Sequence, residues 1–225
     1  MKKPNVIWFI VDQMRGQATG CNGDPNVFTP NLDNMAIGGT NFPDAVSGYP
    51  LCCPFRGSML TGKYAHNHSV KLHEDRLDPS LDTVTDVFRQ NDYETVYLGK
   101  WHLAGFKESE GRSALRTVPP EGRGRFDTWL GYDNNNSQWD CYLHGHDGDE
   151  EVPHYRLPGY ETDCLTDMAL GRIAARSESD RPFFMVVSVQ PPHTPGLAPA
   201  EHRHYQAQQL TLRPNVPGTC GAQAR

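Results

Sequence analysis

The sequence predicts an α/β protein with a mainly parallel sheet flanked by helices. Three runs rich in β-branched and aromatic residues, over residues 5–11, 94–100 and 181–189, have the length and composition of buried strands. Segments with apolar residues at helical spacing lie between them, and this alternation is typical of a parallel sheet covered by helices. The 225 residues, of which 37% are hydrophobic, are enough to bury the core of one large domain.

The first strand and first helix are predicted near the N-terminus. The run "NVIWFIV", residues 5–11, is apolar throughout and ends before the charged residue Asp12. A helix is expected over residues 29–36, where Thr29 can cap the helix and Pro30 suits its first turn.

A second short helix is predicted in "CCPFRGSMLTG". Pro54 fits a first helical turn and Gly62 is a natural stop, so the helix begins near Cys52. The N-terminus of a helix carries unpaired N–H groups and partial positive charge, and Arg56 lies close by in the sequence. This end of the helix is therefore expected to attract an anion.

The remaining elements alternate between helix and strand. A helix is predicted over residues 82–92, a strand over 94–100, a helix over 163–176 and a strand over 181–189. The intervening region, about 105–157, is rich in Gly, Pro, Asn and Asp, and is expected to be a loop-rich insertion on the substrate side.

The stretch "HGHDGDEE" within this insertion has two possible interpretations. His144, His146, Asp147 and Asp149 lie close together in the sequence and could form a metal cluster. A solvated loop is favoured, because no strand or helix is expected to fix their geometry and dense acidic runs are usually exposed.

Polar residues follow three of the predicted strands. Asp12 and Gln13 come after the first strand, Lys100 and His102 end or follow the strand over 94–100, and His193 follows the last strand. Parallel sheets bind ligands at the carboxyl ends of their strands, so these side chains are expected to meet in one ligand site.

Composition excludes several classes of partner. The net charge of -6 forms no basic stripe, which argues against nucleic acid. Six cysteines in a chain of this length do not make a disulfide scaffold, and reduced thiols are expected. The first apolar stretch is interrupted by Asp12 before it reaches signal-peptide length, and no stretch is apolar enough to cross a bilayer. A cytoplasmic location without a membrane partner is therefore predicted.

The chain resembles the formylglycine-dependent sulfatases of the alkaline-phosphatase-like superfamily. The family signature is a cysteine, any residue, proline, a small residue and arginine, followed by Leu-Thr-Gly, and "CCPFRGSMLTG" supplies it except that Phe55 replaces the small residue. Five further segments occur in the family's order: "NVIWFIVDQ", "TPNLDNMA", "TGKYAHNH", "GKWHLAG" and "QPPHTP".

The resemblance implies a reaction and a cofactor made from Cys52. A formylglycine-generating maturation enzyme would oxidise Cys52 to an aldehyde, whose hydrate attacks the sulfur of a sulfate ester with one hydroxyl and expels sulfate through the other. The implied substrate is a small-molecule or carbohydrate sulfate ester. Cys53 occupies the variable position and is expected to be a packing thiol.

The resemblance also assigns the metal ligands. Asp12 and Gln13, together with the group derived from Cys52, would hold one divalent cation, expected to be Ca²⁺, which prefers oxygen ligands. The cation would polarise the sulfate and lower the pKa of the attacking hydroxyl.

The remaining roles fall on cationic and histidine side chains. The resemblance implies that Arg56 stabilises the hydrated aldehyde, and that Lys100 holds a sulfate oxygen. His102 would bond to the formylglycine hydroxyl and help to deprotonate it, while His193 would help to protonate the leaving oxygen. Two more histidines are expected to support the site or line its wall: His66 and His68.

The predicted organisation is one catalytic domain over residues 1–217, with a non-family tail over 218–225. Relatives complete the metal site with Asp-Asn or Asp-His after a later strand and add a second lysine, yet this chain has no aspartate after Asp180. The C-terminal part is therefore expected to be incomplete and the activity impaired.

Two alternatives stay open at this point. A tetrahedral oxyanion site with a divalent cation also suits a phosphonate or phosphate monoester hydrolase of the same superfamily. A catalytically inactive fragment is the other alternative, because part of the expected metal site is missing.

Overall fold

The structure is a computed structural model that describes residues 3–176, 181–206 and 209–216. Its contacts divide the chain into two compact units: Met1–Gln13 with Ser47–Leu197, and Met14–Val46 with Ala198–Arg225. The predicted tail over 218–225 lies outside the described residues, and the domain boundary at residue 217 stays a prediction. Among the described residues, no helix combines the length and apolar character that crossing a membrane requires.

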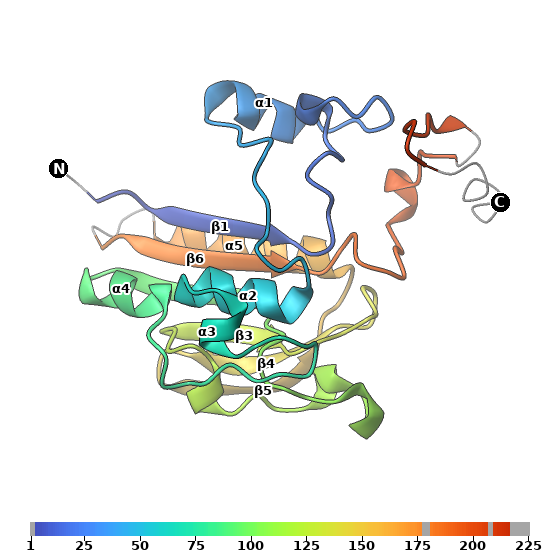
Figure 1. Cartoon of the computed structure of the whole chain (residues 1–225). Coiled ribbons are helices and arrows are strands. Elements are labelled where there is room, and N and C mark those ends of the chain that lie inside the picture. Colours follow the sequence, from blue (N-terminus) through green and yellow to red (C-terminus); the bar gives the residue numbers. More distant parts are fainter. Residues whose placement is uncertain (1–2, 177–180, 207–208, 217–225) are drawn as a thin grey trace. The chain divides into compact units, whose positions relative to one another are not determined.

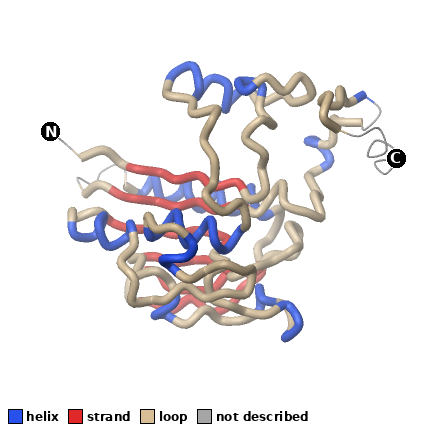
Figure 2. Tube along the Cα trace, viewed as in Figure 1, coloured by secondary structure: helices blue, strands red, loops and turns tan. Residues whose placement is uncertain are grey.

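The first unit is built on a six-stranded sheet in the order β1-β6-β2-β3-β4-β5 (Figures 1 and 2). The first four strands in this order are parallel to one another, and β4 and β5 are antiparallel additions. The predicted α/β class with a mainly parallel sheet is confirmed. The strands are β1 (Val6–Val11), β2 (Glu94–Lys100), β3 (Thr128–Tyr132), β4 (Tyr142–Asp147), β5 (Glu150–Arg156) and β6 (Phe183–Val189).

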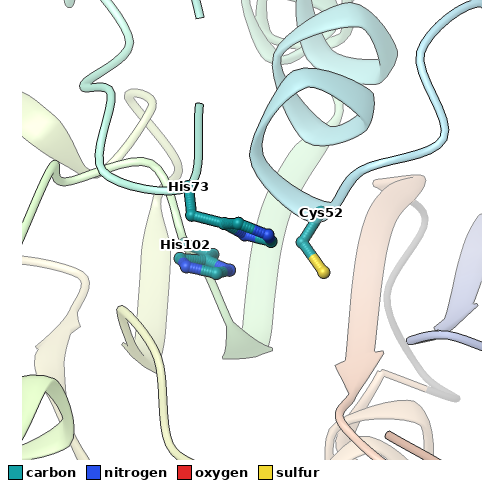
Figure 3. Close-up of side chains that lie close together, drawn as sticks. All are labelled: Cys52, His73 and His102. Atoms are coloured by element: carbon teal, nitrogen blue, oxygen red, sulfur yellow. The ribbon is translucent and has the colours of Figure 1, made fainter. Parts of the chain in front are cut away.

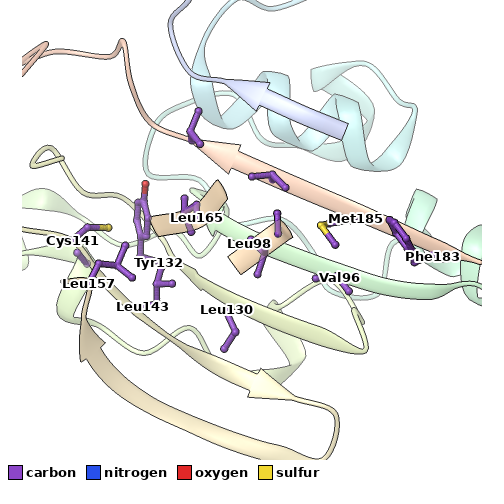
Figure 4. Packing of buried hydrophobic residues seen from close by; sticks show 14 residues of the cluster. Val96, Leu98, Leu130, Tyr132, Cys141, Leu143, Leu157, Leu165, Phe183 and Met185 are labelled. Atoms are coloured by element: carbon purple, nitrogen blue, oxygen red, sulfur yellow. The ribbon is translucent and has the colours of Figure 1, made fainter. Parts of the chain in front are cut away.

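Helices cover both faces of this sheet. In β2, Val96 and Leu98 point into a core shared with Leu165 of α5 (Figure 4), whereas Tyr97 points into a second core shared with Leu60 of α2. This alternation follows from the two-residue period of a strand and explains why β2 is buried throughout. The helices of this unit are α2 (Cys52–Thr61), α3 (Ala65–His68), α4 (Val84–Gln90) and α5 (Glu161–Ala175).

Local signals fix the ends of helices α2 and α4. Helix α2 starts at Cys52 and ends before Gly62, which adopts a left-handed φ of 67° while its amide donates to Ser58 O. Helix α4 begins with a capping box in which Thr83 and Asp86 satisfy each other's backbone N–H groups. Gly62 was the predicted end of α2, whereas α4 was predicted from apolar residues at helical spacing over residues 82–92.

The second unit contains α1 (Pro30–Gly38), which begins at the predicted proline. Thr29 occupies the N-cap position, but its hydroxyl makes no capping bond to the helix. It accepts instead from Gly20 N at 2.8 Å and donates to Asp33 Oδ1 at 3.0 Å.

The loop-rich interpretation of residues 105–157 is wrong for its second half, which forms β3, β4 and β5. His144 lies on β4 with 1% of its surface exposed, so the solvated-loop interpretation fails for this residue. Gly145 marks close packing, since a Cβ there would lie 1.8 Å from Trp129 O. The acidic end of the stretch, from Asp147 through Asp149 to Glu151, is exposed as expected.

Candidate active site

The carboxyl edge of the sheet brings three predicted residues into contact with a fourth, Asp12. Lys100 Nζ lies 2.6 Å from Asp12 Oδ2, and Arg56 Nη2 lies 3.5 Å from the same oxygen. Cys52 Sγ donates to Asp12 Oδ1 at 3.3 Å. These contacts join the end of β1, the end of β2 and the first turns of α2 in one buried polar cluster.

Arg56 ties helix α2 to the sheet beneath it. Its Nη1 donates to Lys100 O at 2.7 Å and to Ser188 Oγ at 2.8 Å, so one guanidinium bridges α2, β2 and β6. The planar fork of an arginine is suited to several fixed acceptors at once, which a lysine could not satisfy. The position of Cys52 relative to the strand ends therefore depends on Arg56.

The electrostatics of this cluster favour an anion. Burial opposes ionisation of Asp12, but Arg56 and Lys100 outweigh it and hold the pKa of this carboxyl well below its usual range. Two buried cations then face one carboxylate. The cluster carries an excess of positive charge next to the N-terminus of α2, where backbone N–H groups add to it.

Cys52 itself is a protonated thiol in this environment. Burial raises the pKa of the thiol, and the neighbouring Asp12 raises it further, while Lys100 opposes the shift. Since the thiolate is the nucleophilic form of cysteine, the unmodified side chain is poorly suited to nucleophilic catalysis.

His102 follows β2 and is buried beside Cys52. Its backbone has a left-handed φ of 55°, a conformation that is uncommon for a histidine and is concentrated at functional sites. Burial lowers the pKa of this imidazole well below its ordinary value, and Lys100 and Arg56 lower it further. His102 is therefore a neutral imidazole near neutral pH and can accept a proton.

A cavity of about 670 Å³ opens in front of this cluster. Its wall combines histidines, charged side chains and apolar side chains. The lining residues include Leu51, Leu72, His73, Glu74, Asp75, His102, Phe106, Lys107, Glu108, Asn134, Asn136 and His193.

Gln13 and His193 lie at the neighbouring ends of β1 and β6. Gln13 Oε1 accepts from Thr194 N at 3.3 Å, which connects the two segments. The backbone oxygen of His193 accepts from Gln138 Nε2 at 2.9 Å, and its ring lines the cavity. The structure thus brings the seven predicted site residues to one edge of the sheet, with direct contacts among Asp12, Cys52, Arg56 and Lys100.

His73 is a candidate site residue that the sequence did not reveal. Its ring stacks near that of His102, with centroids 5.8 Å apart, and both rings point toward Cys52 (Figure 3). Ligand atoms of these three side chains lie within 4.8 Å of one another. His73 belongs to an irregular segment outside the family motifs, so neither periodicity nor a motif marked it.

The other predicted histidines lie outside this cavity wall. His66 is exposed and stacks on Tyr64. His68 is buried, with Nε2 3.0 Å from Ser58 Oγ and Nδ1 accepting from Val70 N at 3.2 Å. His68 therefore has a structural role, whereas Cys53 is the buried packing thiol that was expected.

Asp12 and Gln13 present the donor atoms that a hard cation prefers. Asp12 Oδ2 is buried and has no hydrogen bond besides its ion pair, and Gln13 offers an amide oxygen. Carboxylate and amide oxygens suit Ca²⁺, although six to eight such oxygens usually surround this ion. The two residues fit the predicted metal as a partial ligand set.

A parallel sheet with an excess of buried positive charge at its carboxyl edge defines an α/β protein with an oxyanion site. The sequence matches the family model described as sulfatase over residues 4–215. This chain therefore belongs to the sulfatase family.

Relatives and solved structures agree with this membership. The ulvan-active sulfatase of Formosa agariphila is 36% identical over 228 residues, which cover 99% of this chain and 42% of that enzyme. The structure of the candidate sulfatase yidJ from Bacteroides fragilis matches with a TM-score of 0.81 and 28% identity, over 96% of this chain and 51% of that one. A structure solved with its substrate, D-glucosamine-2-N,6-O-disulfate, matches with a TM-score of 0.71 and 28% identity, over 86% and 35%. This chain thus spans about two fifths of the length of the Formosa enzyme.

Proposed function

We propose that this chain carries the nucleophile and the oxyanion-binding groups of a sulfatase that hydrolyses sulfate monoesters at a formylglycine derived from Cys52. One observation carries the proposal: Cys52 lies at the N-terminus of α2, in contact with Asp12, where Arg56 and Lys100 supply excess positive charge. An excess of positive charge suits a sulfate monoester, which carries one negative charge.

The state of the thiol supports conversion of Cys52. A thiol with a raised pKa is a weak nucleophile, so the position gains reactivity when the sulfur is replaced. Formylglycine supplies, as its hydrate, one hydroxyl that attacks sulfur and a second whose deprotonation releases sulfate. The maturation enzyme is the partner that this conversion requires, and it must accept Phe55 in the motif.

Each neighbouring side chain has a role that its environment supports. Arg56 is fixed by three elements and holds the hydroxyl groups at residue 52, while Lys100 attracts a sulfate oxygen. His102, neutral and buried, accepts a proton from a hydroxyl at residue 52. His193 lies in the cavity wall, where its ring donates a proton to the leaving oxygen.

Asp12 and Gln13 would hold the divalent cation, for which Ca²⁺ is the best match to their oxygen donors. The cation supplies positive charge that polarises the sulfate. Lys100 Nζ lies 2.6 Å from Asp12 Oδ2 and balances the charge of this carboxylate.

The proposed substrate class is a sulfated carbohydrate. The cavity wall contains apolar side chains that can cover the face of a sugar ring, such as Leu72 and Phe106, and polar groups that can bond to hydroxyls, such as Asn134 and Asn136. The similar structure solved with a glucosamine disulfate supports this class.

The test compares the 225-residue chain with the longest product of its gene, each co-expressed with a formylglycine-generating enzyme. Peptide mass spectrometry should show an aldehyde at Cys52 and an unchanged thiol at Cys53. Hydrolysis of 4-nitrophenyl sulfate should be lost in Cys52→Ala and retained in the matched variant Cys53→Ala. In any form that shows turnover, the activity should depend on Cys52 in this way.

Two results would contradict the proposal. Hydrolysis that persists in Cys52→Ala would remove the nucleophile from its assigned position. Faster turnover of a 4-nitrophenyl phosphonate than of the sulfate would favour the phosphonate monoester hydrolase instead.

A further inference from the structure

Cys52, His73 and His102 form a cluster that the proposed hydrolysis does not use as a unit. One ligand atom from each side chain lies within 4.8 Å of the other two, and no other such group of Cys, His, Asp or Glu occurs in the described part of the chain. Figure 3 shows both imidazole rings turned toward the sulfur. The three side chains come from the start of α2, the segment after α3 and the residue position just beyond β2.

Sulfur and imidazole nitrogen are the ligands that Zn²⁺ prefers in proteins. Around a tetrahedral Zn²⁺, ligand atoms stand about 3.5 Å apart, given bond lengths of about 2.0–2.3 Å. Side-chain shifts of about one ångström would therefore bring this cluster to zinc geometry. Three protein ligands with an open fourth position is the arrangement of accessible zinc sites.

We propose that the unconverted chain binds one Zn²⁺ through Cys52 Sγ and a ring nitrogen each of His73 and His102. The thiol loses its proton to solvent as the metal binds, and a water completes the fourth position from the cavity. This inference does not rest on the proposed function, because it concerns the thiol and not the aldehyde.

One nitrogen of the cluster lacks a partner, and the Cys52 thiol would exchange its bond to Asp12 for the metal. His102 is only 6% exposed, and its Nδ1 is buried without a hydrogen-bond partner among the described residues. The backbone of His73 is anchored, since Cys53 Sγ donates to His73 O at 2.9 Å. Binding of Zn²⁺ would therefore give His102 Nδ1 a partner. It would not require the backbone around His73 to become ordered, because that backbone is already anchored.

The surrounding charges permit a dication. Arg56 and Lys100 oppose it, but Asp12 contacts both of these cations and also lies 3.3 Å from Cys52 Sγ. Three carboxylates line the same cavity and add negative charge on the solvent side: Glu74, Asp75 and Glu108.

Zinc binding would have a consequence for maturation. A metal-bound thiolate is shielded from oxidation and alkylation, so folded, unconverted chain that holds Zn²⁺ would keep Cys52 in its thiol form. The metal would then compete with any oxidant that reaches Cys52 after folding.

The experiment uses the 225-residue chain expressed without a maturation enzyme and stripped of metal with EDTA. Co²⁺ serves as the first probe, because a cobalt–thiolate bond gives a charge-transfer absorption band that an oxygen or nitrogen site lacks. One equivalent of Zn²⁺ should remove the band by displacement, and should slow alkylation of Cys52 by iodoacetamide, as followed by peptide mass spectrometry. Ca²⁺ should do neither, because it prefers oxygen ligands.

His73→Ala is the decisive variant, because His73 is exposed and its replacement leaves the core intact. It should weaken Zn²⁺ binding about 10- to 100-fold or more, and Cys52→Ser should abolish the cobalt band. His66→Ala and Cys21→Ser, both at exposed residues, are matched controls that should bind as the unaltered chain does. Circular dichroism checks that each variant is folded. Zinc affinity that is unchanged in His73→Ala, or cobalt binding without a thiolate band, would overturn the proposal.

Discussion

Acidification is expected to destabilise this chain through His144, which is buried as a neutral imidazole. Its Nε2 accepts from Val118 N at 2.8 Å, a bond that requires an unprotonated nitrogen. Its ring stacks on His154 with centroids 4.2 Å apart. Burial, together with the adjacent His154 and Arg123, lowers the pKa of His144 from 6.5 to about 3, against a smaller opposing effect of Glu151.

The sign and size of the effect follow from proton linkage. Between the unfolded pKa of 6.5 and the folded value of about 3, the unfolded chain binds a proton at His144 that the folded chain does not. Stability therefore falls as the pH falls through this window. At pH 5, roughly 1.5 units below the unfolded pKa, the loss from this one group is about 2 kcal/mol.

The assay is urea unfolding followed by circular dichroism at pH 7 and pH 5. His144→Gln keeps an acceptor within reach of Val118 N but cannot titrate, so it should lose about 2 kcal/mol less than the unaltered chain between the two pH values. His66→Gln changes an exposed histidine and should behave as the unaltered chain does. An equal loss in His144→Gln and the unaltered chain would refute the assignment of this pH dependence to His144.

Two further predictions concern the packing and charge of the sheet edge. Gly99→Ala should lower the free energy of unfolding by on the order of 3 kcal/mol in the same urea titration. The reason is that Gly99 has a φ of +98° and a Cβ there would lie 2.2 Å from Ser188 O. Gly16→Ala is the control and should have little effect, because a Cβ at Gly16 would have no atom within 4 Å. Asp12→Asn should lower the free energy of unfolding, measured in EDTA, by about 3–5 kcal/mol, because it leaves buried Lys100 without its carboxylate. Adding Lys100→Met should recover part of that loss. A loss below about 1 kcal/mol for Asp12→Asn would show that the ion pair is not needed for folding.

The parallel part of the sheet could be predicted because its signals are local. Strands β1, β2 and β6 are short apolar runs that end at polar residues, and Gly62 marks the end of α2 through a conformation that glycine adopts readily. The β4–β5 hairpin could not be predicted in the same way. Its burial depends on distant partners, since Arg123 pairs with Glu151 at 2.7 Å and Gly145 packs against the backbone of Trp129.

The same distinction explains what the sequence reveals about the site. Asp12 and Lys100 sit at strand ends, and a parallel sheet gathers its carboxyl ends at one edge whatever the loops do. His73 reaches the site through contacts between segments. The bridge between Arg76 and Ala104 and the bond from Cys53 Sγ to His73 O hold its segment against the residues that follow β2. No local pattern encodes those contacts.

The two proposals make opposite use of the atom at the end of the Cys52 side chain. As a thiol, that side chain would supply the third ligand of the proposed zinc site with His73 and His102. Without the sulfur, two imidazoles would remain as the only ligands of this cluster. After the proposed conversion, an oxygen would replace the sulfur. The side chain at this position already contacts the carboxylate of Asp12. Oxygen donors from residues 12, 13 and 52 would then form a set that suits Ca²⁺ and discriminates against Zn²⁺. Conversion of one side chain would therefore change the metal preference of the site as well as its nucleophile, which makes zinc and calcium affinities, measured on the two forms, independent readouts of maturation.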